Sequence, residues 1–164
     1  LAPTSDLLSH ETKQIVNKEV CSFAINGITN LSEELIEKYS LNCKRAKMFK
    51  NYYTYLYGLP MKLEDEGTIV DQTVTTKTFK GKKYLVLKVN YSKEVGKDTW
   101  YFYFDPKTYA MEVYQFFKEA KNSGEYILLS GLETINNIKM PKNRAWYYNK
   151  DDGYLGTDIL SSKK

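Results

Sequence analysis

Few residues of this chain have the types and spacing that enzyme or metal chemistry needs. The single histidine, His10, lies in an N-terminal stretch without a clear period, and any nucleophile with a histidine base would have to be built on it. Cys21 and Cys43 stand 22 positions apart, which together with one distant histidine matches no zinc-ligand pattern. We therefore expect neither a nucleophilic catalytic site nor a metal site.

Two other motifs are weak candidates for ligand chemistry. Gly153 and Gly156 lie in a predicted hairpin and not ahead of a helix, so a phosphate-binding loop has no support. The acidic run Glu64-Asp65-Glu66 has the oxygen ligands of a hard cation, although a solvated turn is the simpler interpretation. No carboxylate pair is marked out for glycoside hydrolysis. The sequence therefore predicts a protein that is not an enzyme and has no cofactor.

The two cysteines allow two interpretations. Either they close a disulfide, which contributes about 3 kcal/mol by the chain-entropy model, or they are two buried thiols. The strand expected to carry Cys21 leads through a short helical connection into the helix expected to carry Cys43. We therefore expect the two residues to lie near each other.

Charge and composition exclude some classes of partner. The net charge is +4, but acidic and basic residues are interspersed, which is typical of a solvated surface and does not predict nucleic-acid binding. No run of about 18 apolar residues occurs, so no transmembrane segment is expected. Aromatic residues make up 15% of the chain, a share that favours strands. A chain of 164 residues predicts a single domain, 1–164, with one core.

The stretch from Asp98 to Phe117 is expected to form the centre of the fold. Its first half places large rings with the period of two of a pleated strand. Asp105-Pro106-Lys107-Thr108 then favours a turn, because Asp accepts hydrogen bonds from the following backbone and Pro presets φ. The alternation resumes from Met111. We expect an antiparallel hairpin in the middle of the sheet, with Trp100 largely buried.

The N-terminal third predicts one strand and two helices. Lys13 to Ile25 has the composition of a strand. Ser32 is a good N-cap for a helix over Glu33 to Tyr39. A longer helix is expected over Leu41 to Tyr57, because apolar residues recur there at helical spacing.

The end of the longer helix is marked by two residues. Gly58 is expected to end it in the left-handed conformation, and Pro60 prevents its resumption. The alternative is that Tyr52 to Tyr57 forms a strand. Beyond Pro60, short strands are expected over residues 68–79, 83–91, 98–104, 110–118, 125–133, 138–140, 144–149 and 154–160. Such a series makes an antiparallel meander, so the fold class is mainly β with α (α+β).

Five runs of the sequence carry a family resemblance. They are TYLYGLPMKLEDEGT (54–68), GKDTWYFYFDPKTY (96–109), GEYILLSG (124–131), KMPKNRAWYYN (139–149) and YLGTDIL (154–160). In this order they resemble an uncharacterised family of secreted or envelope proteins related to the lipoprotein-carrier (LolA-like) fold.

The resemblance implies a strongly curved antiparallel sheet that forms an unclosed half-barrel, with one or two helices packed on its concave face. It also implies a periplasmic or outer-membrane-associated location in a Gram-negative-type cell. Such folds have more strands upstream of the helices than Lys13 to Ile25 provides. The chain is therefore interpreted as a whole domain or as the C-terminal portion of a longer protein.

The leading hypothesis is a non-enzymatic envelope protein that binds a hydrophobic ligand, such as an acyl chain, a lipid or a lipid-modified segment. A sheet that curves without closing leaves a concave face, and large rings on it suit an apolar ligand. The alternative is that these side chains pack on one another as an ordinary core. The expected ligand-binding residues are Leu85, Leu87, Val89, Trp100, Phe102, Val113, Phe117 and Trp146 on the sheet, Tyr52 and Leu56 on the helix above it, and Arg144 as a partner for a headgroup or carboxylate.

The second hypothesis is a structural or interaction module that docks a protein, for example another envelope protein, or a glycan. The expected contacts are Tyr101, Tyr103, Tyr114 and Tyr147 on a Tyr-rich sheet face. Trp and Phe rings turned inward beneath a helix favour the first hypothesis, whereas tyrosines turned outward favour the second.

Overall fold

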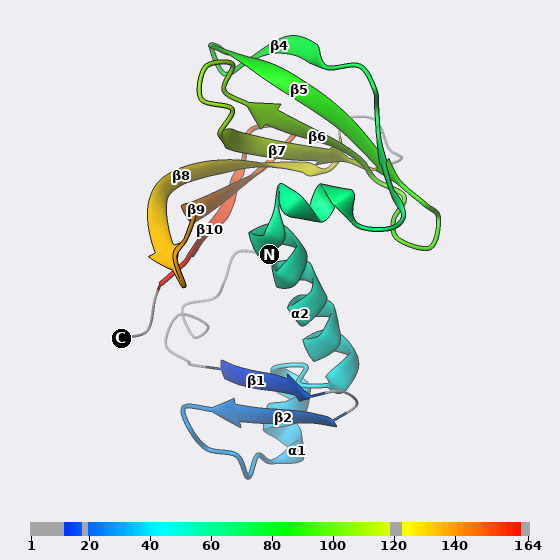
Figure 1. Cartoon of the computed structure of the whole chain (residues 1–164). Helices are drawn as coiled ribbons and strands as arrows, with labels where there is room; N and C mark the ends of the chain where they lie inside the picture. The colour runs from blue at the N-terminus through cyan, green and yellow to red at the C-terminus, as the bar shows by residue number, and fades with distance from the viewer. Residues whose placement is uncertain (1–11, 18–19, 119–122, 162–164) are drawn as a thin grey trace. The chain divides into compact units, whose positions relative to one another are not determined.

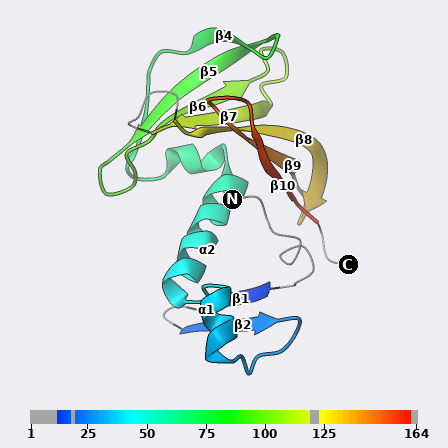
Figure 2. The same ribbon diagram turned by 180° about the vertical axis from the view of Figure 1, so that it is seen from behind.

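The structure is a computed structural model that describes residues 12–17, 20–118 and 123–161. The chain forms two compact units, Leu1–Leu59 and Pro60–Lys164, which we describe one at a time (Figure 1; Figure 2 gives the view from behind). The described residues are mainly β, and their sheets are antiparallel and open. This confirms the predicted α+β class. That the two units make the single domain expected from the chain length stays a prediction.

The first unit contains a two-stranded sheet. β1 (Thr12–Asn17) and β2 (Val20–Ile25) pair antiparallel, with Asn17 opposite Val20 (Figure 1). The single strand expected over Lys13 to Ile25 is therefore wrong. Asn17 is the one usual turn residue at this point, because Lys18 and Glu19, which lie outside the described residues, are not favoured in turns. This signal is too weak to divide the strand by sequence alone.

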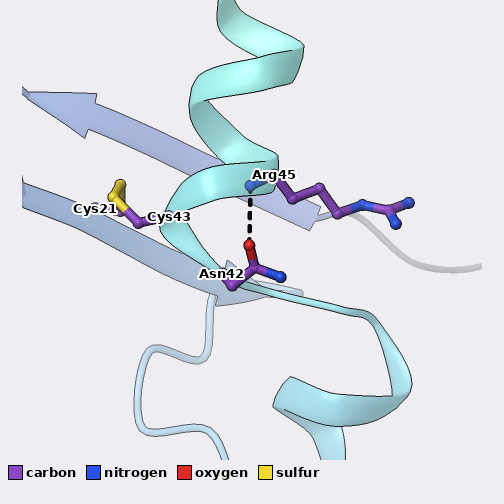
Figure 3. The surroundings of a disulfide bond; sticks show 4 residues. All are labelled: Cys21, Asn42, Cys43 and Arg45. Atoms are coloured by element: carbon purple, nitrogen blue, oxygen red, sulfur yellow. Dashed lines mark hydrogen bonds between the residues drawn. A yellow bond between two sulfur atoms is a disulfide. The ribbon is translucent and has the colours of Figure 1, made fainter.

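Two helices follow the small sheet, and both begin at side-chain caps. α1 (Glu33–Lys38) starts after Ser32, whose hydroxyl accepts a hydrogen bond from the backbone N–H of Leu35, as predicted. α2 (Cys43–Gly58) starts after Asn42. The Asn42 side-chain oxygen accepts from the backbone N–H of Arg45 at 2.9 Å (Figure 3).

α2 ends at Gly58, but not in the left-handed conformation that the sequence predicts. Gly58 is helical, and Leu59 is extended with φ −67° and ψ 143°. Pro60 explains this, because proline disfavours helical backbone for the residue before it. The alternative strand over Tyr52 to Tyr57 is also wrong, since those residues belong to the helix.

A disulfide joins Cys21 of β2 to Cys43 in the first turn of α2 (Figure 3). The two Cα atoms are 5.4 Å apart. This confirms that the two residues are neighbours, and it decides between the two interpretations in favour of the bond. The cross-link matters because the first unit has a small core, whose described buried residues are Ala24, Ile25, Leu41, Ala46, Leu56 and Leu59.

The second unit is an eight-stranded antiparallel sheet preceded by a short 3-10 helix, η2 (Met61–Glu64). The strand order is β10-β9-β8-β7-β6-β5-β3, and β4 also pairs with β5. The strands are β3 (Thr68–Val70), β4 (Thr75–Phe79), β5 (Lys82–Tyr91), β6 (Thr99–Phe104), β7 (Met111–Phe117), β8 (Glu125–Ile135), β9 (Ile138–Tyr148) and β10 (Tyr154–Ile159). The hairpin of β6 and β7 lies in the middle of the sheet, as predicted.

Two strand predictions need correction. The strand expected over 68–79 is two strands, β3 and β4, which pair with different halves of β5. The two strands expected over 138–140 and 144–149 are one, β9, which continues through Pro141. Pro141 lies opposite Leu132 of β8, at the end of β9 where β10 no longer pairs with it.

The return from β7 to β8 is fixed by Gly124 and Asn149. Gly124 has φ +101°, and a Cβ at this position would collide with the carbonyl oxygen of Phe116. The Asn149 side-chain amide donates to the carbonyl oxygens of Phe116 and Ser123, at 2.9 and 3.3 Å. These contacts hold the end of β7 at the start of β8.

Lys82 ties the turn between β6 and β7 to β5. Its Nζ lies 2.8 Å from Asp105 Oδ2 and 2.7 Å from Glu112 Oε2. Asp105 also accepts from the backbone N–H groups of Lys107 and Thr108, at 2.8 and 2.9 Å, which is the predicted turn chemistry. The ion pair with Lys82, together with these backbone bonds, holds the pKa of Asp105 well below its usual range.

The double substitution Cys21→Ser with Cys43→Ser should lower the free energy of unfolding of the first unit by about 3 kcal/mol, because the bond restricts the unfolded chain. Hydrogen exchange of the backbone amides of β2 and α2 measures the effect, with the amides of β6 and β7 as the internal reference. Thiol titration of the denatured, unreduced parent protein should detect no free thiol. Unchanged exchange in β2 and α2 would contradict the prediction.

The substitution Lys82→Met should raise the pKa of Asp105 toward its ordinary value of about 3.9. A depressed carboxyl pKa contributes stability above that value and loses it as the pH falls below, so the variant should lose less stability between about pH 4 and pH 2 than the parent. Carboxyl NMR titration measures the pKa. Lys107→Met, which keeps the backbone N–H bond to Asp105, is the control; an equal shift in both variants would refute a specific effect of Lys82.

Candidate ligand-binding face

Backbone pairing sorts the side chains of the second unit onto two faces of its sheet, because directly paired residues point the same way. The tryptophan face includes Leu85, Leu87, Val89, Trp100, Phe102, Phe104, Met111, Tyr114, Phe116, Glu125, Ile127, Leu129, Arg144, Trp146 and Tyr148. The tyrosine face consists of Phe79, Tyr84, Val86, Tyr101, Tyr103, Val113, Gln115, Tyr126, Leu128 and Tyr147.

Most of the predicted ligand-binding residues of the sheet share the tryptophan face. They are Leu85, Leu87, Val89, Trp100, Phe102, Trp146 and Arg144. Val113 and Phe117 do not, because Val113 pairs with Tyr103 and Phe117 with Thr99. Their placement with the tryptophans is wrong.

A β-bulge at Glu112 explains this error. Phe104 pairs with Met111, whereas the preceding Tyr103 pairs with Val113, so β7 has one extra residue at this point. Without it, the turn register would place Val113 opposite Phe102, on the tryptophan face. One inserted residue reverses the orientation of every later side chain of β7.

The tryptophan face has a buried centre and a partly exposed margin. Val89, Phe102, Tyr114 and Ile127 have no exposed area. Around them, the partly buried residues are Leu85, Leu87, Trp100 and Trp146. The Trp100 ring stacks on Phe116 with 4.7 Å between centroids. An apolar molecule would meet the margin of this face and not its centre.

Polar groups border the tryptophan face on β9 and β10. Arg144 is only 2% exposed, and its Nη1 donates to the carbonyl oxygen of Pro141 at 3.0 Å. Asp158 lies opposite Arg144 and accepts from the Trp146 indole N–H at 3.0 Å. Glu125 pairs with Phe116 on the same face, and burial raises its pKa. Sequence reasoning missed both acidic residues. The alternation of β8 would have indicated Glu125, whereas the irregularity of β10 near Gly156 hides the orientation of Asp158.

The tyrosine face is a packed layer of rings. Phe79 contacts Tyr103 and Tyr126 with centroid distances of 5.2 and 5.3 Å, and Tyr126 stacks on Tyr147 at 5.1 Å. Tyr103 is 4% exposed and donates its hydroxyl to Gln115 Oε1 at 2.6 Å. Burial raises the pKa of Tyr103 to about 12. The rings of this face therefore belong to the protein's own core.

The second hypothesis loses two of its four expected contacts. Tyr103 is buried, and Tyr114 is buried on the opposite face. Only Tyr101 and Tyr147 are partly exposed on the tyrosine face.

The turn between β4 and β5 covers one end of the tyrosine face. Three strands separate β4 from β8, a distance of about 19 Å in a flat sheet, yet Phe79 contacts Tyr126. Lys80 Nζ lies 2.9 Å from Asp152 Oδ2, and the Tyr126 hydroxyl donates to Asp152 Oδ1 at 2.8 Å. The edge strand is thus tied to the turn that follows β9, over the rings.

The remaining predicted site residues lie elsewhere. Leu56 and Tyr52 are on α2, where Leu56 is 1% and Tyr52 37% exposed. They belong to the first unit, so their expected place above the sheet stays a prediction. His10 lies outside the described residues.

Other chemistry has little support in the part of the chain that the structure describes. No group of three or more His, Cys, Asp or Glu side chains gathers there in a way that suits a metal ion. In the acidic run, Asp65 forms an ion pair with Lys62. None of the described helices is long and apolar enough to cross a membrane.

Alanine substitutions should measure how the tryptophan face is packed. Phe102→Ala should cost about 3–5 kcal/mol of unfolding free energy, and Trp100→Ala about 3 kcal/mol, because Trp100 keeps some exposure. Tyr154→Ala, at a residue that is 61% exposed, should cost under about 1 kcal/mol. Denaturant unfolding followed by circular dichroism gives all three values. A loss at Trp100 as small as that at Tyr154 would contradict the described packing.

Comparisons with known proteins give a family but no relative of known activity. No curated protein and no solved structure shows significant similarity to this chain. Residues 6–162 match a family of unknown function (DUF6503). Because this match spans both units, the chain belongs to the DUF6503 family.

Proposed function

We propose that this protein binds a hydrophobic ligand, such as an acyl chain, a lipid or a lipid-modified segment, at the tryptophan face of its second unit. The observation that carries the proposal is that both tryptophans of the chain, Trp100 and Trp146, lie on this face and keep exposed area. Large rings at a partly exposed margin suit an apolar ligand, because contact removes water from both.

The choice between the two faces follows from their packing. The tyrosine face is filled by its own rings and is covered at one end by Phe79 and Lys80. A ligand there would have to displace a packed core, which is costly. At the tryptophan face, a ligand adds contacts to Leu85, Leu87 and the tryptophans.

Arg144 suggests the chemistry of one end of the ligand. It is a buried cation on the same face as Trp146. A carboxylate or phosphate headgroup would gain a charge-assisted hydrogen bond from such a guanidinium, while the acyl chain lies along the rings.

In this proposal the sheet is an unclosed half-barrel of the LolA-like kind, and the protein is a non-enzymatic carrier of the cell envelope. Curvature is supported by the contact of Phe79 with Tyr126 across four strand spacings, which bends the sheet toward its tyrosine face. The proposed site on the tryptophan face therefore differs from the concave-face site that the resemblance implies. A location outside the cytoplasm is supported by the disulfide, since such bonds persist in oxidising compartments. The fold alone does not carry this function.

Tryptophan fluorescence tests the proposal directly. Dibromostearic acid quenches tryptophan on contact, and in this chain every tryptophan reports on the proposed face. We expect saturable quenching with about one ligand per chain, and a rise in thermal stability with ligand concentration. Stearic acid should bind without quenching and should compete.

The matched variants are Leu87→Gln and Leu128→Gln. Both leucines are partly buried in the same sheet, but Leu87 is on the tryptophan face and Leu128 on the tyrosine face. Leu87→Gln should weaken binding about tenfold more than Leu128→Gln, with folding of each checked by circular dichroism. Absence of quenching by the folded parent protein, or equal effects of the two variants, would refute binding at this face.

A further inference from the structure

The first unit contains an open groove, whose lining shares no residue with the tryptophan face. Its volume is about 700 Å³. It is lined by Thr12, Gln14, Ile15 and Val16 of β1 and by Ala46, Phe49, Lys50 and Tyr53 of α2. One wall is therefore a strand and the other a helix.

The helical wall is one continuous stripe of α2. Positions 46, 49, 50 and 53 follow the spacing of a single helix face and extend about 10 Å along the axis. Phe49 and Tyr53 stack with 6.3 Å between their ring centroids. Ala46 leaves room between the helix and the strand. The stripe therefore offers an apolar floor with one cation, Lys50.

The strand wall is an unpaired edge among the described residues, since β1 pairs with β2 alone. The N–H and C=O groups of Ile25 bond to Ile28, so the pair Thr12–Ile25 is one that exchanges no hydrogen bonds. In an antiparallel ladder such pairs alternate. The backbone groups of Thr12, Gln14 and Val16 therefore point away from β2, and these three residues line the groove.

Among the described residues, the one charged residue that lines the groove is a cation, Lys50, and further cations lie on the two elements that form its walls. α2 carries Lys44, Arg45, Lys47 and Lys50 and no acidic residue. Lys13 adds a cation on β1. Such a surface attracts an acidic partner.

We propose that this groove binds an extended, acidic peptide segment of another protein, which adds to β1 as a third strand. The backbone groups of Thr12, Gln14 and Val16 bond to the segment, and its alternate side chains contact Phe49 and Tyr53. Lys50 pairs with a carboxylate of the segment. The site goes beyond the proposed lipid-binding function, because it shares no residue with the tryptophan face.

Labelled peptides test the strand addition on the full chain with its disulfide intact. The probe is a fluorescein-labelled octapeptide of alternating Glu and Val, and fluorescence anisotropy measures its binding. Two derivatives carry N-methyl groups on alternate backbone amides, one derivative on the amides of the Glu residues and the other on those of the Val residues. One derivative should bind at least tenfold more weakly and the other should keep its affinity, because an added strand bonds through only one of its edges. The Lys-Val peptide should bind at least tenfold more weakly than the Glu-Val peptide.

Matched protein variants test the groove itself. Lys50→Glu should weaken binding of the Glu-Val peptide about tenfold, whereas Lys44→Glu, a change of the same charge on α2 outside the groove lining, should have a smaller effect. Gln14→Pro removes one outward N–H and should also weaken binding. If that variant fails to fold, the methylated peptides still test whether the segment adds to β1 as a strand. No binding of the Glu-Val peptide, equal binding of both methylated forms, or equal effects of Lys50→Glu and Lys44→Glu would overturn the proposal.

Discussion

The bulge at Glu112 is the constraint on which the rest of the second unit depends. Because side chains alternate along a strand, one extra residue in β7 decides which rings lie with the tryptophans and which lie with the tyrosines. Lys82 holds the bulged residue and Asp105 at the same point, so the turn is fixed by charge as well as by backbone. β7 is central in the sheet and pairs with β6 and β8. The orientation of its side chains therefore decides which side chains of β6 and β8 share a face with them.

The sequence predicts features of this sheet well where they depend on a local pattern. It predicts them poorly where they depend on pairing with another strand. The alternation over Trp100 to Phe104, the Asp105 turn and the cap at Ser32 are local, and all three are present. The bulge is not visible in the sequence, because Glu112 resembles any exposed strand residue. Continuation of β9 through Pro141 depends on its pairing with Leu132 of β8, which the sequence does not show.

The two faces of the sheet differ in how their side chains are covered. The tyrosine face is completed within the second unit, by rings and by the ion pair of Lys80 with Asp152. The tryptophan face combines a fully buried centre with a partly exposed margin and a buried Arg144. Sequence reasoning found the tryptophans and Arg144 because they follow one alternation, and it missed Asp158 because β10 is short and irregular near Gly156.

The far end of β9 has a consequence for how the protein behaves at high concentration. Among the described residues, β10 pairs with β9 only as far as Asn143, apart from the bond of the Leu160 N–H to the Lys142 carbonyl oxygen. Apolar side chains are exposed nearby, with Leu132 71% and Ile138 53% exposed. An edge of this kind is a template on which further chains add and aggregate. Lys139 and Lys142 are exposed on this part of β9, and charged side chains on an edge oppose the addition of another strand. The two lysines thus protect the sheet against self-association.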